Sequence, residues 1–147
     1  MSAGRVVLIV SIVLYAACMF LGAFYVSLPD SVPGQRSFAD GFGLLSRGWL
    51  GLDLGFEYVP WLANPLLFLA WILVLLRVRL VAVGSAMGAL ALGIAFLGVT
   101  TLDVSSDGPV EITGYGEGYW LWLASMAVAL VAAMLSAKRP QTAKAEV

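Results

Sequence analysis

Four long stretches without a charged side chain constrain what this chain can fold into. They cover residues 6–28, 59–76, 80–102 and 118–137. A helix needs about 20 mostly apolar residues to cross the hydrocarbon of a bilayer. A charge at the centre of such a helix costs about 2.5–3.5 kcal/mol, whereas each Leu, Ile, Val or Phe returns only about 0.3–0.6 kcal/mol. The pattern therefore predicts four transmembrane helices, of which the second is the shortest.

The composition agrees with a fold whose solvent is lipid. Hydrophobic residues make up 61% of the chain and charged residues 12%, against roughly 45–50% and about 25% in soluble domains. The 147 residues are enough for one domain, so we expect a single membrane domain over residues 1–147. The predicted fold class is all-α, an integral membrane four-helix bundle.

The distribution of cations predicts how the bundle is oriented. Six of the eight Lys and Arg residues lie at one end of the predicted bundle, namely Arg5, Arg77, Arg79, Lys138, Arg139 and Lys144. The connections at the other end, residues 29–58 and 103–117, contain only Arg36 and Arg47 as cations, together with several acids. Because cytoplasmic loops are enriched in Lys and Arg, we expect a bacterial inner (plasma) membrane protein with both termini and the tail 138–147 in the cytoplasm.

The first external connection contains an apolar stripe. Its members recur at spacings of four and three residues, which is typical of one helix face; they are Phe38, Phe42, Leu45, Trp49, Leu52 and Phe56. Ser37 followed by Asp40 fits a capping box, although several glycines weaken a continuous helix. We interpret the stripe as a broken amphipathic segment, interfacial or re-entrant, on the outer leaflet. It either covers the bundle or docks an external partner.

Two further groups of residues are candidates for contacts between helices. Trp61 belongs to the aromatic residues expected at the outer interface, and Asn64 is the most polar side chain near the start of the second span. Asn64 is expected to bond to a neighbouring helix, with a ligand contact as the alternative. In the third span, Gly84 and Gly88 form a G-x-x-x-G step that permits close helix packing, either within the bundle or at a homodimer or partner seam.

The residue types that the chain lacks exclude several kinds of chemistry. It contains no His and a single cysteine, Cys18, so zinc and haem chemistry lack their usual ligands. No phosphate-binding glycine motif is present, and the net charge of −1 argues against nucleic acid. Coupled transport usually requires ionisable residues inside the membrane, and small multidrug exporters keep a buried Glu that these spans lack. We therefore expect no enzyme activity, no catalytic or metal-binding residues and no cofactor.

In helix count, size and topology, the chain is similar to the small four-helix inner-membrane immunity proteins that protect bacteria from pore-forming toxins. That resemblance implies a function by binding. The leading hypothesis is a non-enzymatic protein that binds another membrane or envelope protein, or a second copy of itself, as an accessory subunit or an immunity-type protector. The alternatives are a small oligomeric transporter or channel subunit, and a membrane enzyme that uses the external carboxylates Glu57, Asp103 and Glu117. The candidate interaction residues are Phe38, Phe42, Leu45, Trp49, Leu52, Phe56, Trp61, Asn64, Gly84 and Gly88.

Overall fold

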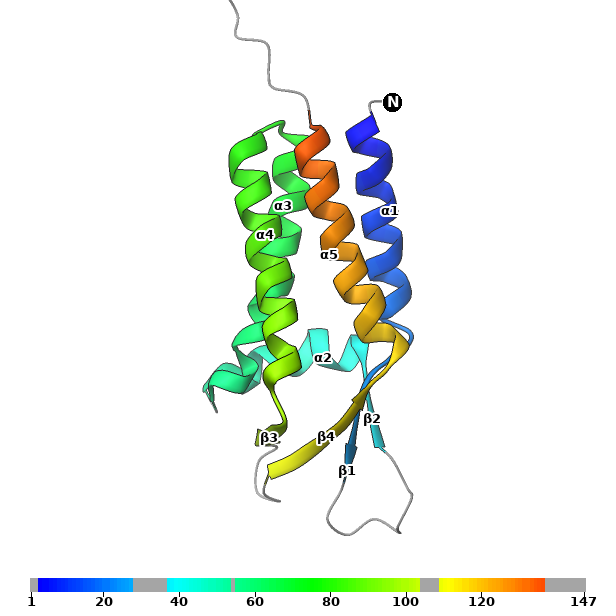
Figure 1. The fold of residues 1–147 in the computed structure, drawn as a ribbon, viewed down its shortest axis with the longest axis vertical. Helices are drawn as coiled ribbons and strands as arrows, with labels where there is room; N and C mark the ends of the chain where they lie inside the picture. The colour runs from blue at the N-terminus through cyan, green and yellow to red at the C-terminus, as the bar shows by residue number, and fades with distance from the viewer. Residues whose placement is uncertain (1–2, 28–36, 54, 104–108, 137–147) are drawn as a thin grey trace, which may run out of the picture.

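The computed structural model describes residues 3–27, 37–53, 55–103 and 109–136 (Figure 1). The α-helices are α1 (Ala3–Cys18), α2 (Gly41–Arg47), α3 (Ala63–Leu75), α4 (Arg79–Ala95) and α5 (Glu117–Leu135). The 3-10 helices are η1 (Gly48–Asp53), η2 (Phe56–Leu62) and η3 (Phe96–Gly98). The strands are β1 (Gly22–Ser27), β2 (Ser37–Asp40), β3 (Thr101–Asp103) and β4 (Pro109–Tyr115).

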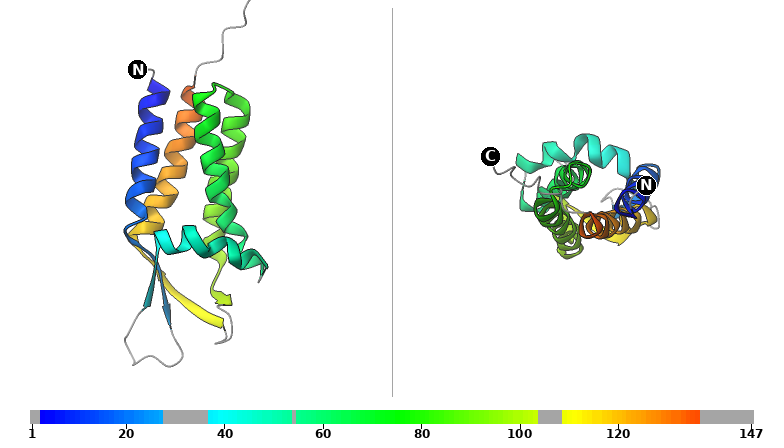
Figure 2. Two further views of the ribbon diagram at one scale, coloured as in Figure 1. Left: turned by 180° about the vertical axis from the view of Figure 1, so that it is seen from behind. Right: turned by 90° about the horizontal axis from the view of Figure 1, so that it is seen from above.

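Four helices run side by side along the long axis, and α2 lies across one end of them (Figures 1 and 2). Helix α5 packs mainly against α1 and also against α4, while α3 packs against α4. Among the described residues, three helical stretches are long and apolar enough to cross a membrane: Phe56–Leu75, Arg79–Gly98 and Glu117–Leu135. They correspond to the second, third and fourth predicted spans. Helix α1 has 16 residues and, at about 1.5 Å per residue, is shorter than a hydrocarbon core of about 30 Å.

The all-α prediction is confirmed only in part. Most of the described structure is helical, but an antiparallel four-stranded sheet in the order β2-β1-β4-β3 extends from the end of the bundle. The predicted first span, residues 6–28, ends as a helix at Cys18 and continues into β1. Phe24, Tyr25 and Val26 have the aromatic and β-branched side chains that fit a strand. A short apolar run of this kind cannot be assigned to helix or strand by periodicity alone.

The third predicted span, residues 80–102, also ends early. Its helix stops at Gly98, and Thr101–Asp103 pairs with β4 as the edge strand β3. Leu102 is buried in a small core under the sheet together with Phe24 and Val110. Leu102 is therefore apolar because it packs under the sheet, and not because the helix continues to it.

The second and third spans form a hairpin, because only residues 77–79 separate them and α3 packs against α4. Helix α3 ends with Arg77 in the left-handed region at φ 60°. The Val78 N–H donates to the Leu73 carbonyl oxygen at 3.0 Å, and the Arg77 N–H donates to the Val74 carbonyl oxygen at 3.2 Å. This pair of bonds is the Schellman motif, in which glycine usually occupies the position of Arg77.

Small side chains bring α4 close to its neighbours. The buried residues of this helix are Ala82, Ser85, Ala86, Ala89 and Gly93. Large apolar side chains lie instead on the outside of the bundle, as Ile9, Val13, Ile72 and Val81 illustrate. A helical bundle with small residues inside and large apolar residues outside is typical of packing in lipid.

We use the name transverse segment for residues 41–62, which comprise α2, η1 and η2. The prediction of a broken helix here is confirmed, since these are three separate short helical pieces. The predicted capping box is placed wrongly: Ser37 lies in β2, and Asp40 is itself the N-cap of α2. The Asp40 carboxylate accepts a bond from the Gly43 N–H at 2.9 Å.

Candidate functional site

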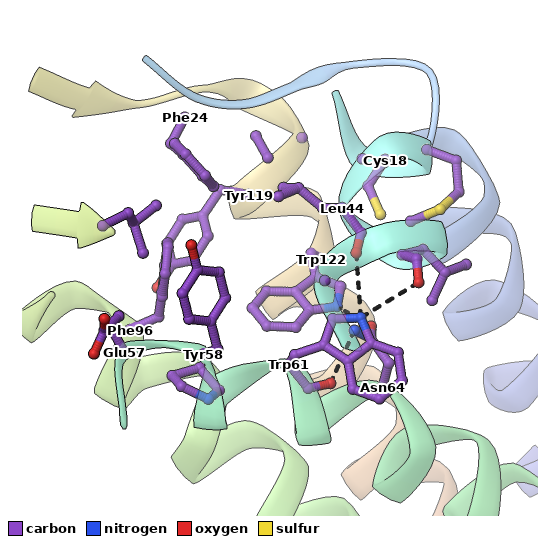
Figure 3. A pocket seen from close by; sticks show the side chains of 18 residues that line it. Cys18, Phe24, Leu44, Glu57, Tyr58, Trp61, Asn64, Phe96, Tyr119 and Trp122 are labelled. Atoms are coloured by element: carbon purple, nitrogen blue, oxygen red, sulfur yellow. Dashed lines mark hydrogen bonds between the residues drawn. The ribbon is translucent and has the colours of Figure 1, made fainter. Parts of the chain in front are cut away.

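A partly enclosed cavity of about 120 Å³ lies where the bundle, the sheet and the transverse segment meet (Figure 3). Its walls come from the end of α1, from β1, from the transverse segment, and from the first turns of α3 and α5. Three of the ten predicted interaction residues line it: Leu45, Trp61 and Asn64. The sequence brought these three to attention for different reasons, and the fold places them together.

Asn64 joins three helices at the wall of the cavity. Its Oδ1 accepts bonds from the Tyr15 hydroxyl at 3.0 Å and from the Trp122 Nε1–H at 2.9 Å. Its Nδ2 donates to the Trp61 carbonyl oxygen at 3.1 Å. The expected bonds from Asn64 to neighbouring helices are thus present, and Figure 3 draws the bonds that join Asn64 to Trp122 and Trp61.

A second polar group lies deeper in the bundle and was missed by sequence reasoning. The Ser11 hydroxyl donates to the Ser125 carbonyl oxygen at 2.7 Å and accepts from the Trp71 Nε1–H at 2.9 Å. Within the described residues, every buried side-chain nitrogen and oxygen has a hydrogen-bond partner. The sequence does show single polar side chains inside apolar runs. Which of them bond to one another across helices cannot be predicted from neighbouring residues alone.

Trp61 faces inward and joins the two ends of the transverse segment, η2 and α2. Its Nε1–H is shared between the Leu44 and Leu45 carbonyl oxygens at 3.2 and 3.3 Å. Gly48 lies against the Trp61 ring so closely that a Cβ would overlap it, and Gly51 has the same relation to Tyr58. These glycines, which weakened the helix prediction, let two aromatic rings pack against the segment.

The predicted stripe is divided between the inside and the outside of the molecule. Leu45 packs against the bundle core, whereas Phe42, Trp49, Leu52 and Phe56 are exposed. Leu50, which was not predicted, is exposed beside them. We call the five exposed residues the outer apolar face; they are Phe42, Trp49, Leu50, Leu52 and Phe56. Phe38 pairs with Tyr25 in the sheet, and its side chain lies outside the described part.

Gly84 and Gly88 do not face the same neighbour. A Cβ on Gly88 would lie 3.3 Å from Leu66 Cδ1, whereas one on Gly84 would meet open space. The first glycine of the predicted step therefore takes no part in packing within the bundle. Its role in a contact with a second protein stays a prediction.

The described charges separate between the two ends of the molecule. Elements at the sheet end carry Asp40, Glu57, Glu111 and Glu117, with Arg47 as the cation. Arg5, Arg77 and Arg79 belong to the opposite end, where the first helix begins and α3 turns into α4 (Figure 1). Asp107 and the tail cations Lys138, Arg139 and Lys144 lie outside the described residues, as does the side chain of Asp103.

Two tyrosines attach the sheet and α5 to the end of α4. The Tyr115 hydroxyl donates to the Phe96 carbonyl oxygen at 3.0 Å, and the Tyr119 hydroxyl donates to the Gly93 carbonyl oxygen at 2.8 Å. Burial raises the pKa of Tyr115 above its ordinary value. Its hydroxyl therefore remains a donor throughout the neutral range.

Most of the side chains that line the cavity are apolar or aromatic. Cys18 donates its thiol to the Tyr15 carbonyl oxygen at 3.0 Å, and Glu57 is the one carboxylate among the lining residues. In the part of the chain that the structure describes, no three His, Cys, Asp or Glu residues are grouped so that they could hold a metal ion.

Comparison with known proteins gives no match: no family model, no curated protein and no solved structure matches the chain.

Proposed function

We propose that this chain is a non-enzymatic integral protein of the bacterial inner membrane that acts by binding another membrane or envelope protein. The observation that carries the proposal is the outer apolar face. Phe56 is 91% exposed and Phe42 is 65% exposed, although they belong to a segment whose inner side is firmly packed. Exposed aromatic side chains on a fixed support are typical of binding surfaces.

Hydrogen bonds within the transverse segment support this face. The Asp40 carboxylate caps the start of α2, and the Trp61 indole N–H ties η2 to the carbonyl oxygens of α2. Trp49 is also oriented, because its Nε1–H donates to the Ser46 carbonyl oxygen at 2.9 Å. A surface whose side chains are already ordered loses less conformational entropy when a partner binds.

The charge around the face favours a partner of complementary chemistry. Asp40, Glu57, Glu111 and Glu117 make the sheet end acidic. Complementary potentials guide association and select among partners. We therefore propose a partner that presents an apolar segment flanked by Lys and Arg on the outer side of the membrane.

The orientation belongs to the same proposal. The cations Arg5, Arg77 and Arg79 gather at the end opposite the sheet, and the positive-inside rule assigns that end to the cytoplasm. The outer apolar face then lies at the outer leaflet, where an accessory subunit or an immunity-type protector would meet its partner.

The test is purification of the tagged chain from native membranes in mild detergent. We expect a stoichiometric partner with the wild type, and at least about tenfold less of it with Trp49→Ala, because interface tryptophans commonly contribute more than 1.4 kcal/mol. The matched control is Trp120→Ala, since both indoles are 54% exposed but Trp120 lies on α5. A chain that purifies alone as a defined homo-oligomer would contradict the proposal and direct attention to transport, with flux into liposomes as the next assay.

A further inference from the structure

The cavity walls are aromatic to an unusual degree. Six aromatic side chains contribute to its lining: Phe24, Tyr58, Trp61, Phe96, Tyr119 and Trp122. The indole N–H groups of Trp61 and Trp122 and the hydroxyl of Tyr119 are already hydrogen-bonded to the protein. These three side chains thus offer a ligand their ring surfaces and not their polar atoms.

Glu57 is the one carboxylate among the described residues of this lining. It is partly exposed, and within the described part of the chain no Lys or Arg forms an ion pair with it. Gly55 leaves the space in which the Glu57 carboxylate lies, since a Cβ there would overlap it. Figure 3 draws Glu57 and the hydrogen-bonded Asn64 at opposite sides of the view, with aromatic rings of the lining drawn between them.

We propose that this cavity binds a small organic cation, a protonated amine or quaternary ammonium group with a compact apolar body. Aromatic faces attract cations through their quadrupoles, and the Glu57 carboxylate supplies the opposite charge. An apolar protein cavity of about 150 Å³ accepts benzene, so a volume of about 120 Å³ suits a body of about six carbons. The same chemistry occurs in free amines and in the ammonium headgroup of an aminophospholipid.

The first experiment measures calorimetric binding to purified protein in a nonionic detergent. Benzylammonium is compared with benzyl alcohol, which has the same ring but no charge at neutral pH. We expect benzylammonium to bind at least about tenfold more tightly, because hydrogen bonds that involve a charged group are stronger than neutral ones. Equal affinity for the two probes would overturn the proposal.

Variants locate the site. Glu57→Gln should remove the preference for benzylammonium and leave the affinity for benzyl alcohol unchanged. Glu117→Gln is the matched control, because Glu117 is exposed in the first turn of α5 and is not part of the lining. Leu44→Trp should fill the cavity and abolish the binding of both probes, with the thermal unfolding midpoint as the check on folding. A preference that survives Glu57→Gln, or binding that survives Leu44→Trp in a folded protein, would overturn the assignment.

The two sources of the ammonium group are then distinguished. A short-chain phosphatidylethanolamine is compared with a phosphatidylglycerol that has the same acyl chains. Displacement of benzylammonium by the ethanolamine lipid alone, dependent on Glu57, identifies a lipid headgroup. Failure of both lipids to compete, with benzylammonium still bound, identifies a free amine. Neither result depends on whether the outer apolar face binds a protein.

Discussion

Asn64 links three helices through one amide group, so removing that amide should break hydrogen bonds to two neighbouring helices. Asn64→Ala leaves the Tyr15 hydroxyl and the Trp122 indole N–H without their acceptor. We expect a loss of about 1–2 kcal/mol in the free energy of unfolding, since buried donors without partners are costly. Unfolding by a denaturing detergent measures it. Ser46→Ala is the control, because the Ser46 hydroxyl is exposed and bonds within α2; equal losses in the two variants would contradict the role of Asn64.

Glycines that look alike in the sequence should respond oppositely to alanine. At Gly48 a Cβ would overlap the Trp61 indole, which must move and weaken its bonds to the Leu44 and Leu45 carbonyl oxygens. At Gly84 a Cβ meets open space, and alanine favours a helix by about 1 kcal/mol over glycine. We therefore expect Gly48→Ala to lower the thermal unfolding midpoint and Gly84→Ala to keep or raise it. A reversed order would show that these environments are wrong.

At this scale the sequence identified residues more reliably than it identified their partners. Asn64 was marked by its polarity in an apolar run, and its bonds to neighbouring helices are present. The sequence could not identify Tyr15 and Trp122 as the donors, because these residues reach Asn64 only through tertiary packing of distant segments. Trp61 was assigned to an interfacial belt by composition, but its ring lines the cavity.

Among the elements, β1 shows where local reasoning ends. Its residues continue an apolar run that began in α1, and nothing nearby in the sequence marks a change of structure. The decisive contacts come from β4, which pairs with β1 from much later in the chain. The Thr113 hydroxyl, for example, donates to the carbonyl oxygen of Tyr25, a residue 88 positions earlier. Pairing at that separation leaves no periodic signal of its own. The stripe in the transverse segment was found because it is local, although η1 and η2 could not be distinguished from an α-helix.

Pairing of β1 with β4 can be tested by a disulfide. In a Cys18→Ser background, Val26→Cys combined with Ile112→Cys should form a cross-link, because the two residues are partners in the sheet register. If the sheet lies outside the cytoplasm, oxidation should occur in cells without an added oxidant. Non-reducing electrophoresis measures the shift in mobility.

The control for this cross-link pairs Val26→Cys with Arg79→Cys, at the opposite end of the molecule. No bond between Val26→Cys and Ile112→Cys even with added oxidant would contradict the register. A bond that forms only after cell lysis would contradict the orientation and leave the register intact.

For the whole molecule, the separation of charge predicts which side each end occupies. In the same Cys18→Ser background, a membrane-impermeant thiol reagent should label Glu111→Cys in intact cells and Arg79→Cys only after permeabilisation. Both native side chains are exposed, so accessibility within the protein does not separate them. The opposite labelling pattern would reverse the proposed topology.

The helical part of the architecture was predictable because it depends on the lengths of the apolar runs. Three of the four spans correspond to helices long and apolar enough to cross a membrane, and the hairpin at Arg77 follows from the short link between two of them. The sheet and the cavity beneath it were not predictable, because both arise where segments from all parts of the chain converge.

The sheet order has a consequence for biosynthesis. The main helical neighbour of α1 is α5, and the strand that completes β1 is β4, so the first segments made by the ribosome find their partners among the last. Until then, α1 lacks its main helical neighbour, although β1 can already pair with β2, and α3 and α4 can associate as a hairpin. A nascent chain that stalls before α5 would leave α1 in the lipid without its main packing partner. Membrane quality control can recognise a helix in that state.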